Sequence, residues 1–111
     1  MGIDIYAEGD ERRGTTNRGY IREAYHGEPY PSFHLLPELF EAHGMTRIPS
    51  ATLRERLPET LKRARERMRR VYELTDENEI EANINQYTDF VEFCEELEDK
   101  SGDPPTVSGS W

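Results

Sequence analysis

The sequence has a single cysteine and no long apolar run, and each shortage excludes a class of protein. Cys94 has no partner for a disulfide and no CxxC spacing for a metal, and its helical spacing from Phe90 and Leu97 predicts a buried core thiol. No stretch approaches the roughly 20 apolar residues that span a bilayer. The beginning, MGIDIYAEGD, lacks the basic end and apolar stretch of a signal peptide. We therefore expect a cytoplasmic protein that does not enter a membrane.

Signatures of common enzymes and cofactor sites are missing as well. There is no GxGxxG or GxxxxGK[ST] phosphate loop and no GxSxG nucleophile elbow. The histidines His26, His34 and His43 are eight and nine residues apart and lack the HxxxH or HExxH spacing of helical metal sites. We assign no catalytic residue, metal or cofactor, and a role without catalysis is favoured over an enzymatic one.

Composition predicts one domain, residues 1–111, with a thin core. Only 34% of the chain is hydrophobic and 33% is charged, and 111 residues fit the size of one domain. One Trp, six Tyr and four Phe, together with many aliphatic residues, place the chain above a disordered composition. We therefore expect it to fold, while its oligomeric state is left open.

Alternation of apolar and polar residues predicts a small antiparallel sheet. In GIDIYAE, Ile3 and Ile5 alternate with polar neighbours, as in a strand with one buried face. GYIREAYHG and PSFHLL are predicted as two strands of a hairpin that turns at residues 27–30 and places Glu23 near His34. After two prolines, TVSGSW fits a terminal strand at the edge of this sheet.

Helical spacing predicts two long helices and one or two short ones. Pro37 suits the first position of a short helix, PELFEAH. Ser50 is the expected N-cap of a second helix, which Pro58 kinks or restarts as a long helix. Ile80 begins a second long apolar stripe that ends before Gly102. The predicted fold is α+β: the sheet packs against two long antiparallel helices and the short ones.

Charge is divided unevenly between the two long helices. The net charge is −9, yet residues 54–72 carry eight basic and three acidic side chains, and residues 73–111 carry one basic and twelve acidic. An antiparallel acidic neighbour screens the basic helix, and aromatic residues do not interleave with its arginines as they do in single-strand binders. We therefore expect intramolecular ion pairs and no direct binding of nucleic acid.

The last helix is the strongest candidate for a partner-binding surface. At 100° per residue its carboxylates fall on one arc opposite the apolar stripe. One interpretation is a solvated helix face, as charge runs usually are. The other is a decoy surface that imitates the spaced charge of nucleic acid and binds a basic surface of another protein, as in a phage-type accessory or anti-defence factor. The candidate residues are Glu81, Asp89, Glu92, Glu95, Glu96 and Asp99.

An alternative is a small enzyme or ligand-binding protein that acts on an anionic small molecule. Its residues would be Arg22, Glu23, Tyr25 and His26 of one strand, with His34 across the hairpin. Strand alternation places Arg22 on one face of the sheet and Glu23 on the other, so the five cannot all converge on one substrate. Polar pairing across the sheet is the simpler interpretation of the set.

Three segments resemble a family of small uncharacterised bacterial and bacteriophage proteins. They are the beginning MGIDIYA, the stretch GYIREAYHG and the end FVEFCEELEDKSGDPPTVSGSW, and together they cover less than half of the chain. The middle of the sequence differs from longer members in length and content. The resemblance implies one compact domain and a mobile-element context, and it transfers no activity or catalytic residue.

Overall fold

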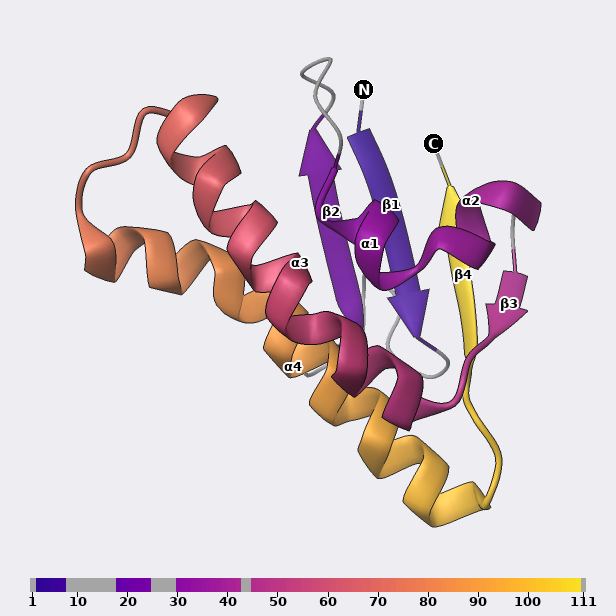
Figure 1. Cartoon of the computed structure of the whole chain (residues 1–111). Helices are drawn as coiled ribbons and strands as arrows, with labels where there is room; N and C mark the ends of the chain where they lie inside the picture. The colour runs from indigo at the N-terminus through magenta and orange to yellow at the C-terminus, as the bar shows by residue number, and fades with distance from the viewer. Residues whose placement is uncertain (1, 8–17, 25–29, 43–44, 111) are drawn as a thin grey trace.

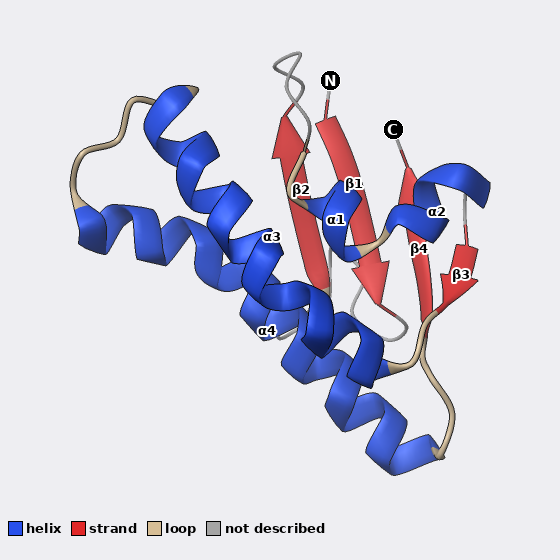
Figure 2. Ribbon diagram, in the orientation of Figure 1, coloured by secondary structure: helices blue, strands red, loops and turns tan. Residues whose placement is uncertain are grey.

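A computed structural model describes residues 2–7, 18–24, 30–42 and 45–110, with the side chains of residues 40–42 excepted. It confirms the α+β class (Figures 1 and 2). The elements in chain order are β1 (Gly2–Ala7), β2 (Tyr20–Ala24), α1 (Ser32–Leu35), α2 (Pro37–Ala42), β3 (Met45–Arg47), α3 (Ser50–Arg70), α4 (Glu77–Ser101) and β4 (Thr106–Ser110).

The four strands form an antiparallel sheet in the order β2-β1-β4-β3. Strand β4 therefore lies inside the sheet, so the prediction that it takes an edge is wrong. Its outer neighbour is β3, which pairs Met45 with Ser108 and was missed because three residues carry too little alternation to identify a strand. Ile3 pairs with Glu23 and Asp4 with Arg22 across β1 and β2.

The predicted hairpin strand PSFHLL is wrong, because Ser32–Leu35 forms the short helix α1. Leu35 and Leu36 are both fully buried. Neighbouring residues of a strand point to opposite faces, whereas a helix end followed by a turn can bury both. The predicted short helix beginning at Pro37 is confirmed as α2.

The helices cover one face of the sheet (Figure 1). Ile3, Ile5, Ile21 and Val107 turn from the strands into the core. On the opposite face Tyr6 and Tyr20 stack with ring centroids 5.2 Å apart. No helix among the described residues combines the length and apolar composition that a bilayer crossing requires. The core residues supplied by the helices include Leu35, Leu36, Leu39, Leu53, Leu57, Ile84, Tyr87, Phe90 and Val91.

Helix α3 is continuous through Pro58 as one helix of 21 residues, so the predicted restart at Pro58 is wrong. A proline inside a helix removes one backbone hydrogen bond. Here Pro58 is exposed, which allows water to reach the carbonyl group that loses its partner. The prediction that Ser50 caps this helix with its own side chain is also wrong: Ser50 is the first helical residue and its hydroxyl donates to Glu98.

Helix α4 follows the predicted apolar spacing closely. Ile80, Ile84, Tyr87, Val91 and Cys94 are all buried. The side chain of Asp76 accepts the backbone N–H of Asn78 at the N-terminus, and Gly102 ends the helix with φ 80°, a left-handed conformation that suits glycine. Burial raises the pKa of Cys94 to about 12. The prediction of a buried core thiol is confirmed, because the residue is not exposed at all.

Gly19 marks a close approach between the start of β2 and helix α4. A Cβ atom at residue 19 would lie 2.6 Å from Cδ2 of Phe93 and 3.0 Å from Cβ of Ala7. We expect Gly19→Ala to lower the free energy of unfolding by about 1–3 kcal/mol, the usual range for overpacking. Urea unfolding followed by circular dichroism measures this change.

A second substitution that relieves the overlap between residue 19 and Phe93 provides the control. Phe93→Leu shortens the opposing side chain, so part of the loss should be recovered when it is combined with Gly19→Ala. Additive losses in the double variant, or no loss in Gly19→Ala alone, would contradict the proposed close approach.

Candidate functional site

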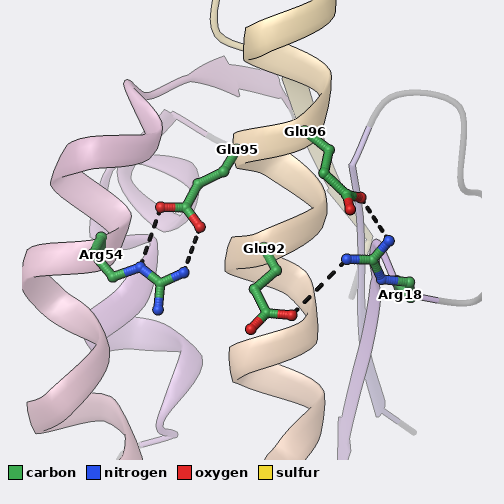
Figure 3. A network of polar contacts seen from close by, with 5 residues as sticks. All are labelled: Arg18, Arg54, Glu92, Glu95 and Glu96. Atoms are coloured by element: carbon green, nitrogen blue, oxygen red, sulfur yellow. Dashed lines mark hydrogen bonds and ion pairs between the residues drawn. The ribbon is translucent and has the colours of Figure 1, made fainter.

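The carboxylates on the exposed arc of α4 fall into two groups. One group points toward α3 and is held there by arginines. Figure 3 shows one of these contacts, in which Nε and Nη2 of Arg54 donate to the two carboxylate oxygens of Glu95, with Nε 3.1 Å from its acceptor. The pairs between the helices include, in order along α4, Glu77–Arg69, Glu81–Arg65 and Glu95–Arg54. The predicted ion pairing between the long helices is therefore confirmed.

The second group, here called the outward stripe, consists of Asp89, Glu92, Glu96 and Asp99. Steps of three, four and three residues place the four carboxylates along about 15 Å of helix. Arg18, in the turn before β2, lies 2.5 Å from Glu96 and 3.9 Å from Glu92, on the opposite side of α4 from Arg54 (Figure 3). The side chains of Glu92 and Glu96 remain 49% and 53% exposed.

Arg18 offsets only part of the charge of the outward stripe. Its guanidinium also lies 5.8 Å from the ring centroid of Phe93, between the two glutamates in sequence. Asp89 and Asp99 are exposed, and no cation among the described residues forms an ion pair with either. The six candidate residues thus divide: Glu81 and Glu95 are engaged by α3, and the other four make up the outward stripe.

The alternative set of ligand-binding residues is not brought together. Arg22 is exposed and contacts Asp4 at 3.3 Å, whereas Glu23 is buried on the other face, which confirms the predicted alternation. The predicted proximity of Glu23 to His34 depended on the hairpin; the residue of α1 that Glu23 contacts is Ser32. Partial burial and then the charge of Arg63 lower the pKa of His34, which belongs to α1 beside α3. Tyr25 and His26 lie outside the described residues.

Glu23 is instead the centre of a buried polar cluster. Its side chain enters the core from β2, and the residue is only 7% exposed. Ser32 donates both its hydroxyl, at 2.9 Å, and its backbone N–H, at 3.3 Å, to the two carboxylate oxygens. The hydroxyl of Tyr87 on α4 donates to the same carboxylate. One side chain therefore joins the sheet, α1 and α4.

Arg67 of α3 supplies a buried positive charge to this cluster. The residue is 6% exposed, its Nη2 donates to the carbonyl of Ala24 at 3.0 Å, and its guanidinium lies 4.7 Å from the ring centroid of Tyr30. From the sequence, Arg67 is one of the basic side chains of residues 54–72, which are expected to pair with the acidic helix. Its position three residues after the buried Ala64 was the available signal, and it was outweighed by the arginines on either side.

Burial raises the pKa of Glu23 from 4.5 to about 7. Removal of a carboxylate from water disfavours its charged form, and this effect is the largest. The hydrogen bonds from Ser32, followed by the positive charge of Arg67, act in the opposite direction. The Tyr87 hydroxyl also favours the charged form, because it donates to the carboxylate.

A second glutamate makes the same pair of contacts at another helix start. Glu98 accepts the hydroxyl of Ser50 at 2.5 Å and its backbone N–H at 3.3 Å. Ser50 begins α3 as Ser32 begins α1, and each serine follows a proline. A carboxylate brought from a distant part of the chain thus replaces the local side-chain cap at both helices.

Nothing in the described part of the chain groups three or more His, Cys, Asp or Glu side chains in a way that could hold a metal ion. Comparison of the chain with protein-family models, curated proteins and solved structures finds no match. The resemblance suggested by the sequence therefore stays a prediction, and the functional interpretation depends on the geometry of the outward stripe and of the Glu23 cluster.

The titration of Glu23 predicts a specific pH dependence of stability. The folded state binds this proton more tightly than the unfolded chain, so the free energy of unfolding should fall as the pH rises from 4.5 to about 7. Glu23→Gln cannot ionise. Relative to the wild-type protein, it should gain on the order of 3 kcal/mol across this range, at about 1.4 kcal/mol per pKa unit. Urea unfolding at a series of pH values tests this.

Glu98→Gln is the matched control for that series. Its carboxylate makes the same contacts with a serine but is half-exposed, so its loss should leave the pH dependence of the wild-type protein in place. If Glu23→Gln follows the wild-type curve in parallel at every pH, Glu23 does not titrate in this range.

Proposed function

We propose that the protein is a small acidic interaction protein that binds a basic surface of another protein through the outward stripe of α4. In the mobile-element context that the sequence suggests, this corresponds to a phage-type accessory or anti-defence factor. The single observation that supports the proposal is the arrangement of Asp89, Glu92, Glu96 and Asp99. These four carboxylates lie in line on a rigid helix and remain available to solvent while the rest of the arc is bonded to α3.

The fixed position of α4 favours binding of a partner to the outward stripe. The α3–α4 ion pairs and the buried apolar stripe hold α4 in place, so a partner does not have to order the helix before it binds. Charged residues at such a surface mainly accelerate association and select partners of opposite charge. A cluster of Lys or Arg side chains is the complementary chemistry.

The charge density of the outward stripe fits binding to a basic patch on a protein better than imitation of a whole nucleic acid strand. The outward stripe has one carboxylate per about 5 Å of helix axis, whereas one DNA strand has one phosphate per about 3.4 Å. Arg18 lowers the density further by its contacts with Glu92 and Glu96. The mimicry of nucleic acid is accordingly partial, and we expect a contact of a few charges.

The alternative function, binding of an anionic small molecule by the second strand, receives no support from this geometry. Arg22 and Glu23 face opposite sides of the sheet, and Glu23 is already engaged by Ser32 and Tyr87. A charge-led protein contact is the proposal that the described residues favour.

The test compares two variants that each lose four negative charges. One replaces the outward stripe (Asp89→Asn, Glu92→Gln, Glu96→Gln and Asp99→Asn). The other replaces exposed acids elsewhere (Glu55→Gln, Glu66→Gln, Glu73→Gln and Asp103→Asn). Tagged proteins are used to capture partners from bacterial lysate at about 0.1 M and about 0.5 M salt, because screening at about 10 Å or less weakens contacts between exposed charges. Any captured protein is then purified, and its affinity for each variant is measured by titration.

We expect a purified basic partner that binds the wild-type protein and the second variant at low salt, dissociates at high salt, and does not bind the variant of the outward stripe. Equal losses in the two variants would show that overall charge, and not the outward stripe, governs binding. The absence of any partner at low salt would contradict the proposed function as a whole.

A further inference from the structure

We propose that Glu23, Ser32 and Tyr87 form a proton-controlled latch that holds helix α1 to the sheet and to α4. In the protonated state of Glu23 the latch is closed, and loss of the proton loosens α1. This inference is independent of the partner proposed for the outward stripe, because it concerns a buried cluster on another part of the molecule.

Glu23 accepts hydrogen bonds from both Ser32 and Tyr87, at the junction of the sheet, α1 and α4. Both hydroxyl groups can donate a hydrogen bond to a carboxylate, and each can also accept a hydrogen bond from a carboxylic acid. The network can therefore be satisfied in either protonation state. What changes on ionisation is the charge that the buried site must accommodate.

The groups around Glu23 set the balance between these states. From α3, Arg67 supplies the one charged side chain that acts on Glu23 appreciably, and it favours ionisation. From α4 and α1 the facing polar groups are the hydroxyls of Tyr87 and Ser32. The residue of β1 paired with Glu23 is Ile3, which carries no charge, while Arg22 and its partner Asp4 lie on the opposite face of the sheet. Burial outweighs Arg67, so ionisation is disfavoured while the latch is closed.

Helix α1 is the element that can open when Glu23 loses its proton. It has only four residues, and its backbone-to-backbone hydrogen bonds are local, such as Leu36 N–H to the carbonyl of Ser32 at 2.8 Å and Phe33 N–H to the carbonyl of Tyr30 at 2.9 Å. Short elements of this kind open locally at lower cost than the whole domain. Opening brings water to Glu23 and removes the penalty on its negative charge.

Amide hydrogen exchange resolved by residue tests the latch. Measured rates at about pH 5 to 8, divided by the intrinsic rates, give opening constants for the amides of Phe33 and Leu36. A site with a pKa of 4.5 when open and about 7 when closed predicts a roughly tenfold rise per pH unit up to about pH 7, followed by a plateau. The amides inside α4, such as that of Val91, open only with the whole domain, so their opening constants should be much smaller than that of Leu36 at every pH.

Three variants and one direct titration complete the experiment. Glu23→Gln should abolish the slope. Glu98→Gln leaves the Glu23 carboxylate in place and should keep the slope. Tyr87→Phe removes a donor to the charged form and should move the plateau to higher pH. Carbon NMR of the Glu23 carboxyl in the wild-type protein gives its titration midpoint without any substitution, in case a variant does not fold.

The latch is overturned by any of three results: a flat opening constant in the wild-type protein, a slope that persists in Glu23→Gln, or an opening constant at Leu36 that equals that at Val91. The last result would mean that α1 opens only when the whole domain unfolds. A Glu23 midpoint near that of a free carboxyl group would likewise exclude the latch. None of these outcomes bears on capture of a basic partner by the outward stripe.

Discussion

The hydrogen bonds of the Glu23 carboxylate join the sheet, α1 and α4 inside the apolar core. A carboxylate in a core costs free energy unless several donors surround it, and here the donors come from α1 and α4 while Arg67 approaches from α3. The arrangement fixes where α1 lies on the sheet. It also makes the local environment sensitive to a proton, because burial has raised the pKa of this group to about 7.

Carboxylates carried from distant segments are used repeatedly in this fold. Glu23 and Glu98 each hold a serine at the first residue of a helix, α1 and α3 respectively, and each serine follows a proline. A carboxylate is well suited to this position, because the exposed N–H groups at a helix start favour negative charge. Part of the acidity of the chain is therefore structural.

Helix α4 carries further acidic side chains and places them on two flanks. Its flank toward α3 is neutralised by arginines such as Arg54, and its other flank meets Arg18 before β2 (Figure 3). Between these contacts the outward stripe keeps its exposure. Exposed ion pairs contribute little to stability, with typical values of about 0–1 kcal/mol, so these arginines matter more for shaping the charged surface than for holding the fold.

Local pattern in the sequence determined the α+β class, the strand at Ile3 and Ile5, and the apolar stripe of α4 with its end at Gly102, because each depends on periodicity or on a residue with special backbone geometry. It also predicted that the two long helices exchange ion pairs. Tertiary structure alone decided that Ser32–Leu35 is helical, that Arg67 is buried, and that Glu23 and Glu98 cap remote helices. Those outcomes depend on which distant groups meet in the core, and the free energy of a buried charge is set by its neighbours in space, not by its neighbours in sequence.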